Sequence, residues 1–306
     1  MARGGVYTLM SRKLRRATLI HNEKAGDRRH TRAYLVGLLE GAGYDVSYFA
    51  VKQGDLAEAL GHPAEIIVSA GGDGTVARVV GQARTDGPAI AILPLGTANN
   101  IAASLGIAGP LEDIVSAWQQ ARMRPYYPIG ASGPWGMRRL IEGVGFGAFE
   151  EAMHAIPRKF RVKRARDFVR KIVVDAPPEC LEIGIEDETI GGRFAVLEIT
   201  AIPLIGPRLP LAPAADPSDR NLEICFVGDN EADRQAFAQW LDNPESAEPA
   251  PVSSRRAQRL TIAGQFRRIR LDSKLWNGEP DARLDNTWPV IGIATEPQPL
   301  HFLVPN

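Results

Sequence analysis

The sequence predicts a two-domain α/β protein, and three observations lead to that class. In the first 125 residues short apolar runs alternate with helix-compatible segments, which is typical of parallel βαβ units. After about Pro125, short apolar or alternating runs follow one another between turns, as in an antiparallel sheet. The length of 306 residues is large for a single hydrophobic core. We therefore expect an α/β domain over residues 1–125 and a mainly antiparallel domain over residues 126–306.

The first domain is expected to follow a loose basic lead-in at residues 1–16. Leucines at helical spacing predict a helix from His30 to Ala42, which Gly43 ends. The other predicted elements are, in order, strand Ala17–His21, strand Tyr44–Phe49, helix Asp55–Leu60 capped by Asp55, a strand at Ile66–Val68, a helix to about Ala83, strand Ala89–Leu93 and helix Leu111–Ala121.

The second domain is predicted from shorter apolar or alternating runs. The expected strands are Arg138–Val144, Leu181–Ile185, Phe194–Ile199, Leu222–Val227, Leu260–Ile262 and Ile269–Leu271, with helices near 147–155, 160–174 and 231–241. The segment Asp242–Ser254 is rich in Pro, Ser and Ala, and it predicts a surface loop without core residues. The extreme C-terminus is a candidate for packing back on the first domain.

Composition limits the classes of function. The formal net charge is zero, so no global field would recruit nucleic acid, and we expect no nucleic-acid partner. The two cysteines, Cys180 and Cys225, lie far apart and lack metal-ligand spacing, which favours a reduced cytoplasmic protein with both in the core. No signal peptide and no apolar run of about 18 residues is evident, so any contact with a membrane is expected to be peripheral.

The stretch around Gly71, Gly72, Asp73, Gly74 and Thr75 predicts strand, glycine-rich turn and helix. Three glycines allow a ligand to approach the backbone closely, and the N–H groups at the helix start favour an anion such as phosphate. A carboxylate beside a phosphate needs a cation between them, so Asp73 suggests Mg²⁺, held directly or through water. The alternative is an ordinary βα turn in which Asp or Thr caps the helix.

Two further polar or glycine-containing loops also follow predicted strands. They are Asn22–Gly26 and Pro94–Asn100. Ligands bind beyond the carboxyl ends of parallel strands, so these loops and the glycine turn should converge on one crevice. For Asn22 the alternative to a phosphate contact is an Asx turn.

Arg158–Lys171 holds the densest positive charge of the chain. On a helix, its apolar residues share one stripe, so a solvated helix packed by that stripe is one interpretation. The other is a basic face against anionic lipid headgroups or nucleotide phosphates.

Several motifs, spread over nearly the whole chain, occur in the order of a known family. They are NEKAG (Asn22–Gly26), GGDGT (Gly71–Thr75), LPLGTAN (Leu93–Asn99), EGVGFG (Glu142–Gly147), Ala212-Pro213 and Asn277-Gly278-Glu279. In these residues the chain resembles the diacylglycerol kinase catalytic-domain family, which includes bacterial lipid kinases and the sphingosine and ceramide kinases.

The resemblance implies ATP- and Mg²⁺-dependent phosphorylation of a lipid hydroxyl by a Rossmann-like domain and a β-sandwich domain with a cleft between them. It implies that Glu279 is the general base, that Asp73 takes part in catalysis, and that Asp219 belongs to a structural Mg²⁺ site. The residues expected to bind the nucleotide are Asn22, Lys24, Gly26, Gly71, Gly72, Asp73, Gly74, Thr75, Gly96, Thr97 and Asn99.

The chain departs from the family pattern at a few positions. Asn277 stands where the family has the Asp of its D-G-E motif, Ala77-Arg78 follow GGDGT in place of Asn-Glu, and Arg220 replaces a glycine after Asp219. Two alternatives therefore remain open: an NAD kinase, whose family shares GGDGT, and a nucleotide- or lipid-binding regulator. The leading hypothesis is a cytoplasmic lipid kinase at the inner membrane face, with a homodimer as an open alternative to a monomer.

Overall fold

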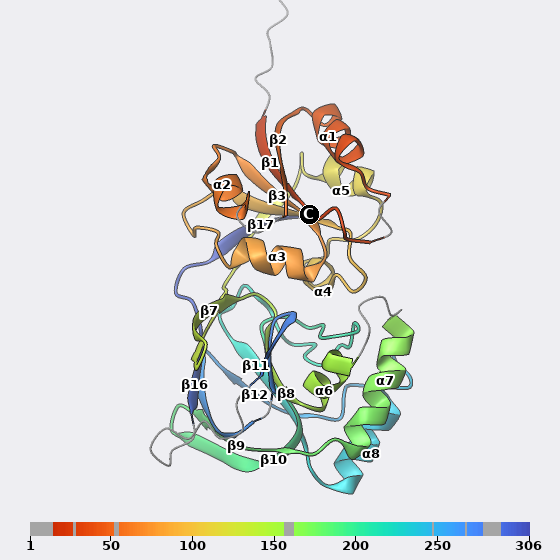
Figure 1. Ribbon diagram of the computed structural model, residues 1–306, viewed down its shortest axis with the longest axis vertical. Helices are drawn as coiled ribbons and strands as arrows, with labels where there is room; N and C mark the ends of the chain where they lie inside the picture. The colour runs from red at the N-terminus through yellow and green to blue at the C-terminus, as the bar shows by residue number, and fades with distance from the viewer. Residues whose placement is uncertain are drawn as a thin grey trace, which may run out of the picture.

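The chain folds around two β-sheets that lie one above the other in Figure 1. The computed structural model describes residues 15–26, 29–51, 55–155, 162–246, 248–266, 268–277 and 289–306. The basic lead-in up to residue 14 and the predicted base Glu279 lie outside the described residues.

The first sheet has six strands in the order β2-β1-β3-β4-β17-β5, and all neighbours are parallel except β17 and β5. Its strands are β1 (Arg15–His21), β2 (Tyr44–Ala50), β3 (Ile66–Gly71), β4 (Ala89–Pro94), β5 (Arg122–Tyr126) and β17 (Leu300–Val304). Its helices are α1 (Arg32–Gly41), α2 (Asp55–Gly61), α3 (Asp73–Val80), α4 (Asn100–Ser104) and α5 (Leu111–Ala117). Strands β3 and β4 are buried apolar runs, as expected where helices cover both faces of a sheet.

The second sheet is antiparallel, and its apolar faces enclose a core of their own. The strands are β6 (Ile129–Gly133), β7 (Gly136–Leu140), β8 (Gly143–Gly147), β9 (Glu179–Ile185), β10 (Glu188–Thr200), β11 (Leu222–Gly228), β12 (Ser253–Ala257), β13 (Arg259–Gln265), β14 (Arg268–Leu271), β15 (Lys274–Asn277) and β16 (Val290–Thr295). Helices α6 (Ala148–Ala155), α7 (Val162–Asp175) and α8 (Glu231–Trp240) pack together along one side of it (Figure 1).

The predicted fold class is confirmed: a parallel α/β sheet precedes a mainly antiparallel one. Within the described residues, the change of sheet falls between β5 and β6, and the last strand, β17, returns to the first sheet between β4 and β5. No helix in the described part of the chain is both long and apolar enough to span a membrane.

Several predicted details are wrong for identifiable reasons. The single strand expected over Arg138–Val144 is broken at Ile141-Glu142, where a buried carboxylate binds the backbone. Cys180 is exposed, because it points outward from β9, whose residues alternate between buried and exposed; Cys225 is buried as expected. The loop expected over Asp242–Ser254 contributes the buried Pro244 and ends in β12.

Candidate active site

Three loops meet at the carboxyl ends of β1, β3 and β4, as the sequence predicts. The amide of Asn22 donates to the hydroxyl of Thr75 at 3.2 Å, which joins the first loop to the glycine turn. A Cβ on Gly26, whose φ is +60°, would lie 2.6 Å from the carbonyl oxygen of Leu95. A Cβ on Gly96 would lie 2.6 Å from the Cα of Gly72. The loops therefore contact each other where glycine supplies the space.

Helix α3 begins directly after this contact. Its N-cap is Gly72, an extended residue that makes no side-chain capping hydrogen bond. The side chain of Thr75, a residue inside α3, fills the space above Gly71, where a Cβ would be 2.2 Å from its hydroxyl oxygen. The N-cap residue Gly72 therefore offers no side-chain acceptor to the first N–H groups of α3, an arrangement that suits a phosphate.

Asp73 has a structural partner that the sequence did not suggest. Its carboxylate accepts a hydrogen bond from the amide of Ile101 at 3.0 Å, in the first turn of α4. Burial raises the pKa of Asp73, while hydrogen bonds from the backbone of Ile101, Asn100 and Asn99 oppose that rise. The short helix α4 was not predicted, and Asp73 joins its start to the start of α3.

The third loop is shaped by Asn99. This residue has a positive φ of 50°, and its side chain accepts from the amide of Gly96 and donates to the carbonyl of Gly96, each at 2.9 Å. Thr97 is exposed at the tip of this loop, and Lys24 is exposed in the first loop. Asn22 also makes the Asx turn considered as its alternative, because its side-chain oxygen accepts from the amide of Lys24 at 3.2 Å.

The second domain reaches this region through the turn between β14 and β15. A Cβ on Gly74 would lie 3.0 Å from the hydroxyl of Ser273, so the turn touches α3. The buried carboxylate of Asp272 accepts from the amides of Ile141, Glu142 and Gly143 at 2.8–3.2 Å. Burial raises the pKa of Asp272 to about 6. The sequence analysis did not predict these contacts of Asp272, although an acidic residue between two short strands is a turn signal.

Below the turn lies a buried charge cluster made of Arg270, Glu142, Glu150 and Glu198. The guanidinium of Arg270 bonds to Glu198 and lies 3.7 Å from Glu150 and 3.8 Å from Glu142. Neither carboxylate oxygen of Glu150 has a hydrogen-bond partner within the described residues. Burial and the neighbouring carboxylates raise the pKa of Glu150 and of Glu142 well above the ordinary range, and Asp73 contributes to the rise at Glu142.

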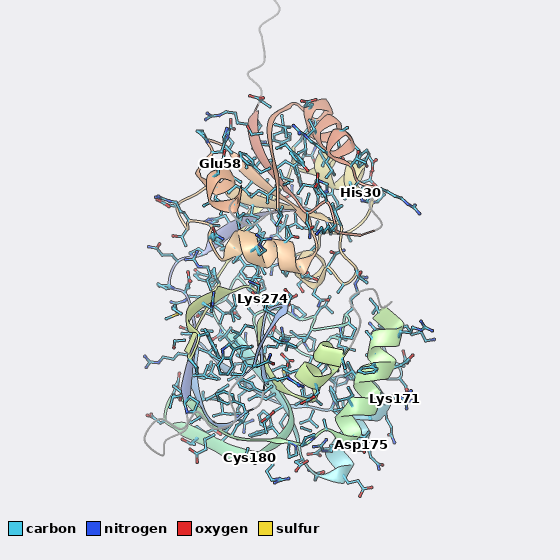
Figure 2. All side chains as sticks on the ribbon, in the orientation of Figure 1. His30, Glu58, Lys171, Asp175, Cys180 and Lys274 are labelled. Atoms are coloured by element: carbon cyan, nitrogen blue, oxygen red, sulfur yellow. The ribbon has the colours of Figure 1, made fainter. Side chains whose placement is uncertain are left out.

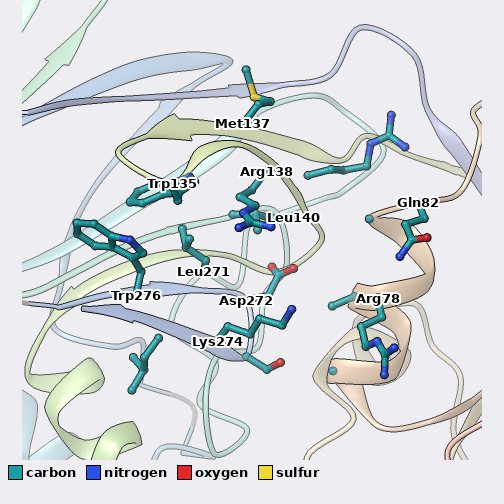
Figure 3. A pocket seen from close by; sticks show the side chains of 16 residues that line it. Arg78, Gln82, Trp135, Met137, Arg138, Leu140, Leu271, Asp272, Lys274 and Trp276 are labelled. Carbon is teal, nitrogen blue, oxygen red and sulfur yellow. The ribbon is translucent and has the colours of Figure 1, made fainter. Parts of the chain in front are cut away.

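A cavity of about 410 Å³ opens between α3 and the two hairpins β6–β7 and β14–β15. Gly74, Ala77 and Arg78 form one wall, and the opposite wall includes Trp135 and Trp276 (Figure 3). Gly74 belongs to both this wall and the glycine turn. On β15 the lining extends from Lys274 to Trp276.

Asp219 does not have the surroundings of a metal ligand. One of its oxygens accepts from Arg256 at 2.6 Å and the other from the amide of Asn221 at 2.8 Å. Arg256 also pairs with the buried Glu223 at 2.7 Å. In the described ranges, no three His, Cys, Asp or Glu side chains gather as a candidate metal site. A guanidinium supplies the positive charge at the place where the resemblance implies Mg²⁺.

Two arginines of the basic helix form ion pairs within the protein. Arg166 of α7 pairs with Glu245, and Arg170 pairs with Asp242. Lys163 and Lys171 are exposed; Figure 2 shows Lys171 on the outer side of α7. The residues between 158 and 161 fall in the gap before α7 that the structure leaves undescribed.

Comparison with known proteins agrees with this architecture. Residues 16–128 match the model of the diacylglycerol kinase catalytic domain. The chain is 30% identical over 228 residues to the diacylglycerol kinase of Bacillus subtilis (strain 168), which covers 70% of this chain and 74% of that protein.

Solved structures show the same fold. A crystal structure of a diacylglycerol kinase from Bacillus anthracis str. Sterne superposes with a TM-score of 0.67 at 15% identity, covering 95% of this chain and 97% of that one. A second structure from the same organism, provisionally named a diacylglycerol kinase, gives a TM-score of 0.73 at 18% identity, covering 95% and 98%. With the sequence match, the glycine turn and the two-sheet plan, the chain belongs to the diacylglycerol kinase family, a family of kinases that transfer a phosphoryl group to a hydroxyl.

Proposed function

We propose that this kinase transfers the γ-phosphoryl group of ATP, with Mg²⁺, to a hydroxyl of a diacylglycerol-like or sphingosine-like lipid. The observation that carries the proposal is the uncapped start of α3 at the point where three loops meet. The name of the Bacillus subtilis relative supports a lipid acceptor. Net charge near zero and the absence of a nucleic-acid motif give no support to nucleic acid as acceptor.

The nucleotide phosphates would be held by the backbone amides of Gly72, Asp73 and Gly74, with Lys24 and Thr97 at the rim. Amides aimed at an anion stabilise developing charge without reorganisation. Asp73 fits a magnesium ion only through its remaining lone pairs or through water, because one carboxylate oxygen already accepts from α4. When bound, Mg²⁺ supplies charge neutralisation to the phosphate oxygens.

Glu279 is proposed as the general base that accepts the proton of the attacking hydroxyl. We also propose that the protein meets the inner face of the membrane peripherally, through the exposed lysines of α7. A homodimer remains an alternative to a monomer. The regulator hypothesis finds support in one observation: Asp219, which the resemblance assigns to a structural Mg²⁺ site, is paired with Arg256.

The test uses purified protein, labelled ATP and separate acceptors: diacylglycerol, sphingosine, phospholipids and NAD. Label in a lipid that depends on Mg²⁺ supports the proposal, and label only in NADP rejects it in favour of an NAD kinase. ATP binding without transfer to any acceptor favours the regulator. Glu279→Gln should abolish turnover and leave ATP affinity nearly unchanged; retained turnover would reject the role of Glu279.

A further inference from the structure

The cavity between α3 and the two hairpins differs in character from end to end. Figure 3 shows Trp135 and Trp276 together at one end and Arg78 on α3 at the other, with Arg138 and Lys274 between them. The two indole rings pack edge to face with centroids 5.3 Å apart. Met137, on the same wall, is 73% exposed. The cavity is thus apolar at one end and cationic toward the glycine turn.

The cations of this cavity are not all neutralised within the protein. Arg139 pairs with Glu296 at 2.7 Å, but Arg138 and Lys274 have no ion-pair partner in the part of the chain that the structure describes. Asp272 is the acidic residue of the lining, and its carboxylate is held by three backbone amides. Figure 2 places Lys274 at the boundary between the two domains. A ligand with a negative charge would therefore complement this wall better than a neutral one.

We propose that this cavity receives the headgroup of the acceptor, and that the acceptor is an anionic glycerophospholipid with a free hydroxyl on its headgroup. This inference rests on the proposed lipid kinase function. A volume of about 410 Å³ is near the lower end of the usual range for small-molecule sites. It suits a headgroup, while the acyl chains stay in the bilayer. The tryptophans and the exposed Met137 then face the boundary between headgroup and chains, where aromatic side chains are favoured.

Gly74 connects the cavity to the proposed phosphate site. Since Gly74 lies in both the cavity wall and the glycine turn, a headgroup hydroxyl in the cavity is adjacent to the proposed phosphate site. The hydroxyl oxygen forms a bond to the γ-phosphorus, and the bond from that phosphorus to the β,γ-bridging oxygen breaks. ADP leaves, and the hydroxyl proton passes to the general base that the proposed function requires. The product is a phosphomonoester on the lipid headgroup.

The experiment compares phosphatidylglycerol and diacylglycerol as acceptors in detergent micelles. Phosphatidylmethanol, which is anionic but has no headgroup hydroxyl, keeps the surface charge constant. We expect a higher kcat/KM with phosphatidylglycerol. Arg138→Gln and Lys274→Gln should each raise the KM for phosphatidylglycerol about tenfold, the loss expected for a charge-assisted hydrogen bond, and leave the KM for ATP unchanged. Arg122→Gln, an exposed arginine on β5 outside the cavity, is the matched control and should change neither.

Three results would overturn the inference. They are a preference for diacylglycerol at equal surface charge, a rise in the KM for ATP alone in Arg138→Gln, and equal effects of Arg138→Gln and Arg122→Gln. Absence of transfer to every lipid would instead reject the proposed function. In that case, binding to the cavity is measured without turnover. The protein is titrated with dihexanoyl phosphatidylglycerol and its tryptophan fluorescence is recorded. A saturable change that is lost in Trp276→Phe and absent with dihexanoyl phosphatidylcholine supports the site; no such change rejects it.

Discussion

At the scale of single residues, Gly96 illustrates how little room separates the loops. Its missing Cβ would lie 2.6 Å from the Cα of Gly72 and 2.7 Å from the side-chain oxygen of Asn99. Because one of these neighbours is backbone, Gly96→Ala must push the third loop away from the glycine turn. We expect at least a tenfold loss of ATP affinity, measured by calorimetric titration.

The control for Gly96→Ala is Gly37→Ala. Gly37 is exposed in α1, and a Cβ there meets nothing within 4 Å. Alanine should stabilise the helix by up to about 1 kcal/mol and leave ATP affinity unchanged. Equal ATP affinity in the Gly96 variant would show that the loops are not packed as described.

Arg256 is expected to replace a structural cation. Without nucleotide, Mg²⁺ should not change the Tm of the wild-type protein, because Arg256 already neutralises Asp219 and the buried Glu223. Arg256→Ala leaves Glu223 buried and unpaired, at a cost of about 1–3 kcal/mol, and its lower Tm should rise in part when Mg²⁺ is added. In Arg256→Ala combined with Asp219→Asn that recovery should be weaker. A wild-type Tm that rises with Mg²⁺ and depends on Asp219 would contradict this prediction.

At the scale of elements, helix α7 is connected to the third nucleotide loop through one short segment. Arg166 donates to the carbonyl oxygens of Pro207 and Arg208 at 2.9 and 2.8 Å. Arg208 in turn donates to the carbonyl of Ala98 at 2.6 Å, and Asn100 donates to the carbonyl of Gly206 at 2.9 Å. The basic helix therefore contributes to the position of the loop that is expected to hold the nucleotide.

This connection separates the roles of two arginines on α7. Both pair with an acidic residue of the segment after α8, but of the two only Arg166 is seen to bond the backbone of residues 207–208 in the described structure. Arg166→Ala should raise the Kd for ATP several-fold and speed amide hydrogen exchange at residues 98–100. Arg170→Ala should do neither. If both variants behave alike, α7 acts only through its charge.

The elements also show what sequence reasoning can reach. Strands β1, β3 and β4 and their loops were predictable, because buried apolar runs ending in glycine or polar residues are local patterns. The roles of Asp272 and Arg208 could not be predicted, because each side chain bonds to backbone more than 100 residues away in sequence. Helix α4 was missed because it has five residues and its start is capped by Asp73 from another element.

At the scale of the whole molecule, the buried cluster predicts an unusual dependence of stability on pH. Burial raises the pKa of Glu150, Glu142 and Glu198 above 4.5 and that of Asp272 to about 6. Folding therefore takes up protons above pH 4.5, where the unfolded carboxylates are ionised. The stabilisation is complete below the unfolded pKa and is lost as the pH rises through the folded pKa. Each such proton lowers the free energy of unfolding by about 1.4 kcal/mol per pH unit in that window.

Glu150→Gln tests this dependence, because neither of its carboxylate oxygens accepts a hydrogen bond within the described residues. Urea unfolding between pH 5.5 and 8.5 should give a shallower loss of stability than in the wild type, and a higher free energy of unfolding at pH 8.5. Glu58→Gln, on the exposed side of α2, should leave the curve unchanged. A Glu150 variant that is less stable at pH 8.5 would contradict the prediction.

Strand β17 has a consequence for how the polypeptide is made. Residues 300–304 lie between β4 and β5 and complete the sheet that carries the glycine turn (Figure 1). During translation these residues leave the ribosome after the whole second sheet, although nascent domains usually fold in order from the amino end. The nucleotide-binding half therefore cannot close until the entire second sheet has been synthesised, and a deletion of residues 300–304 would leave a gap in the middle of that half.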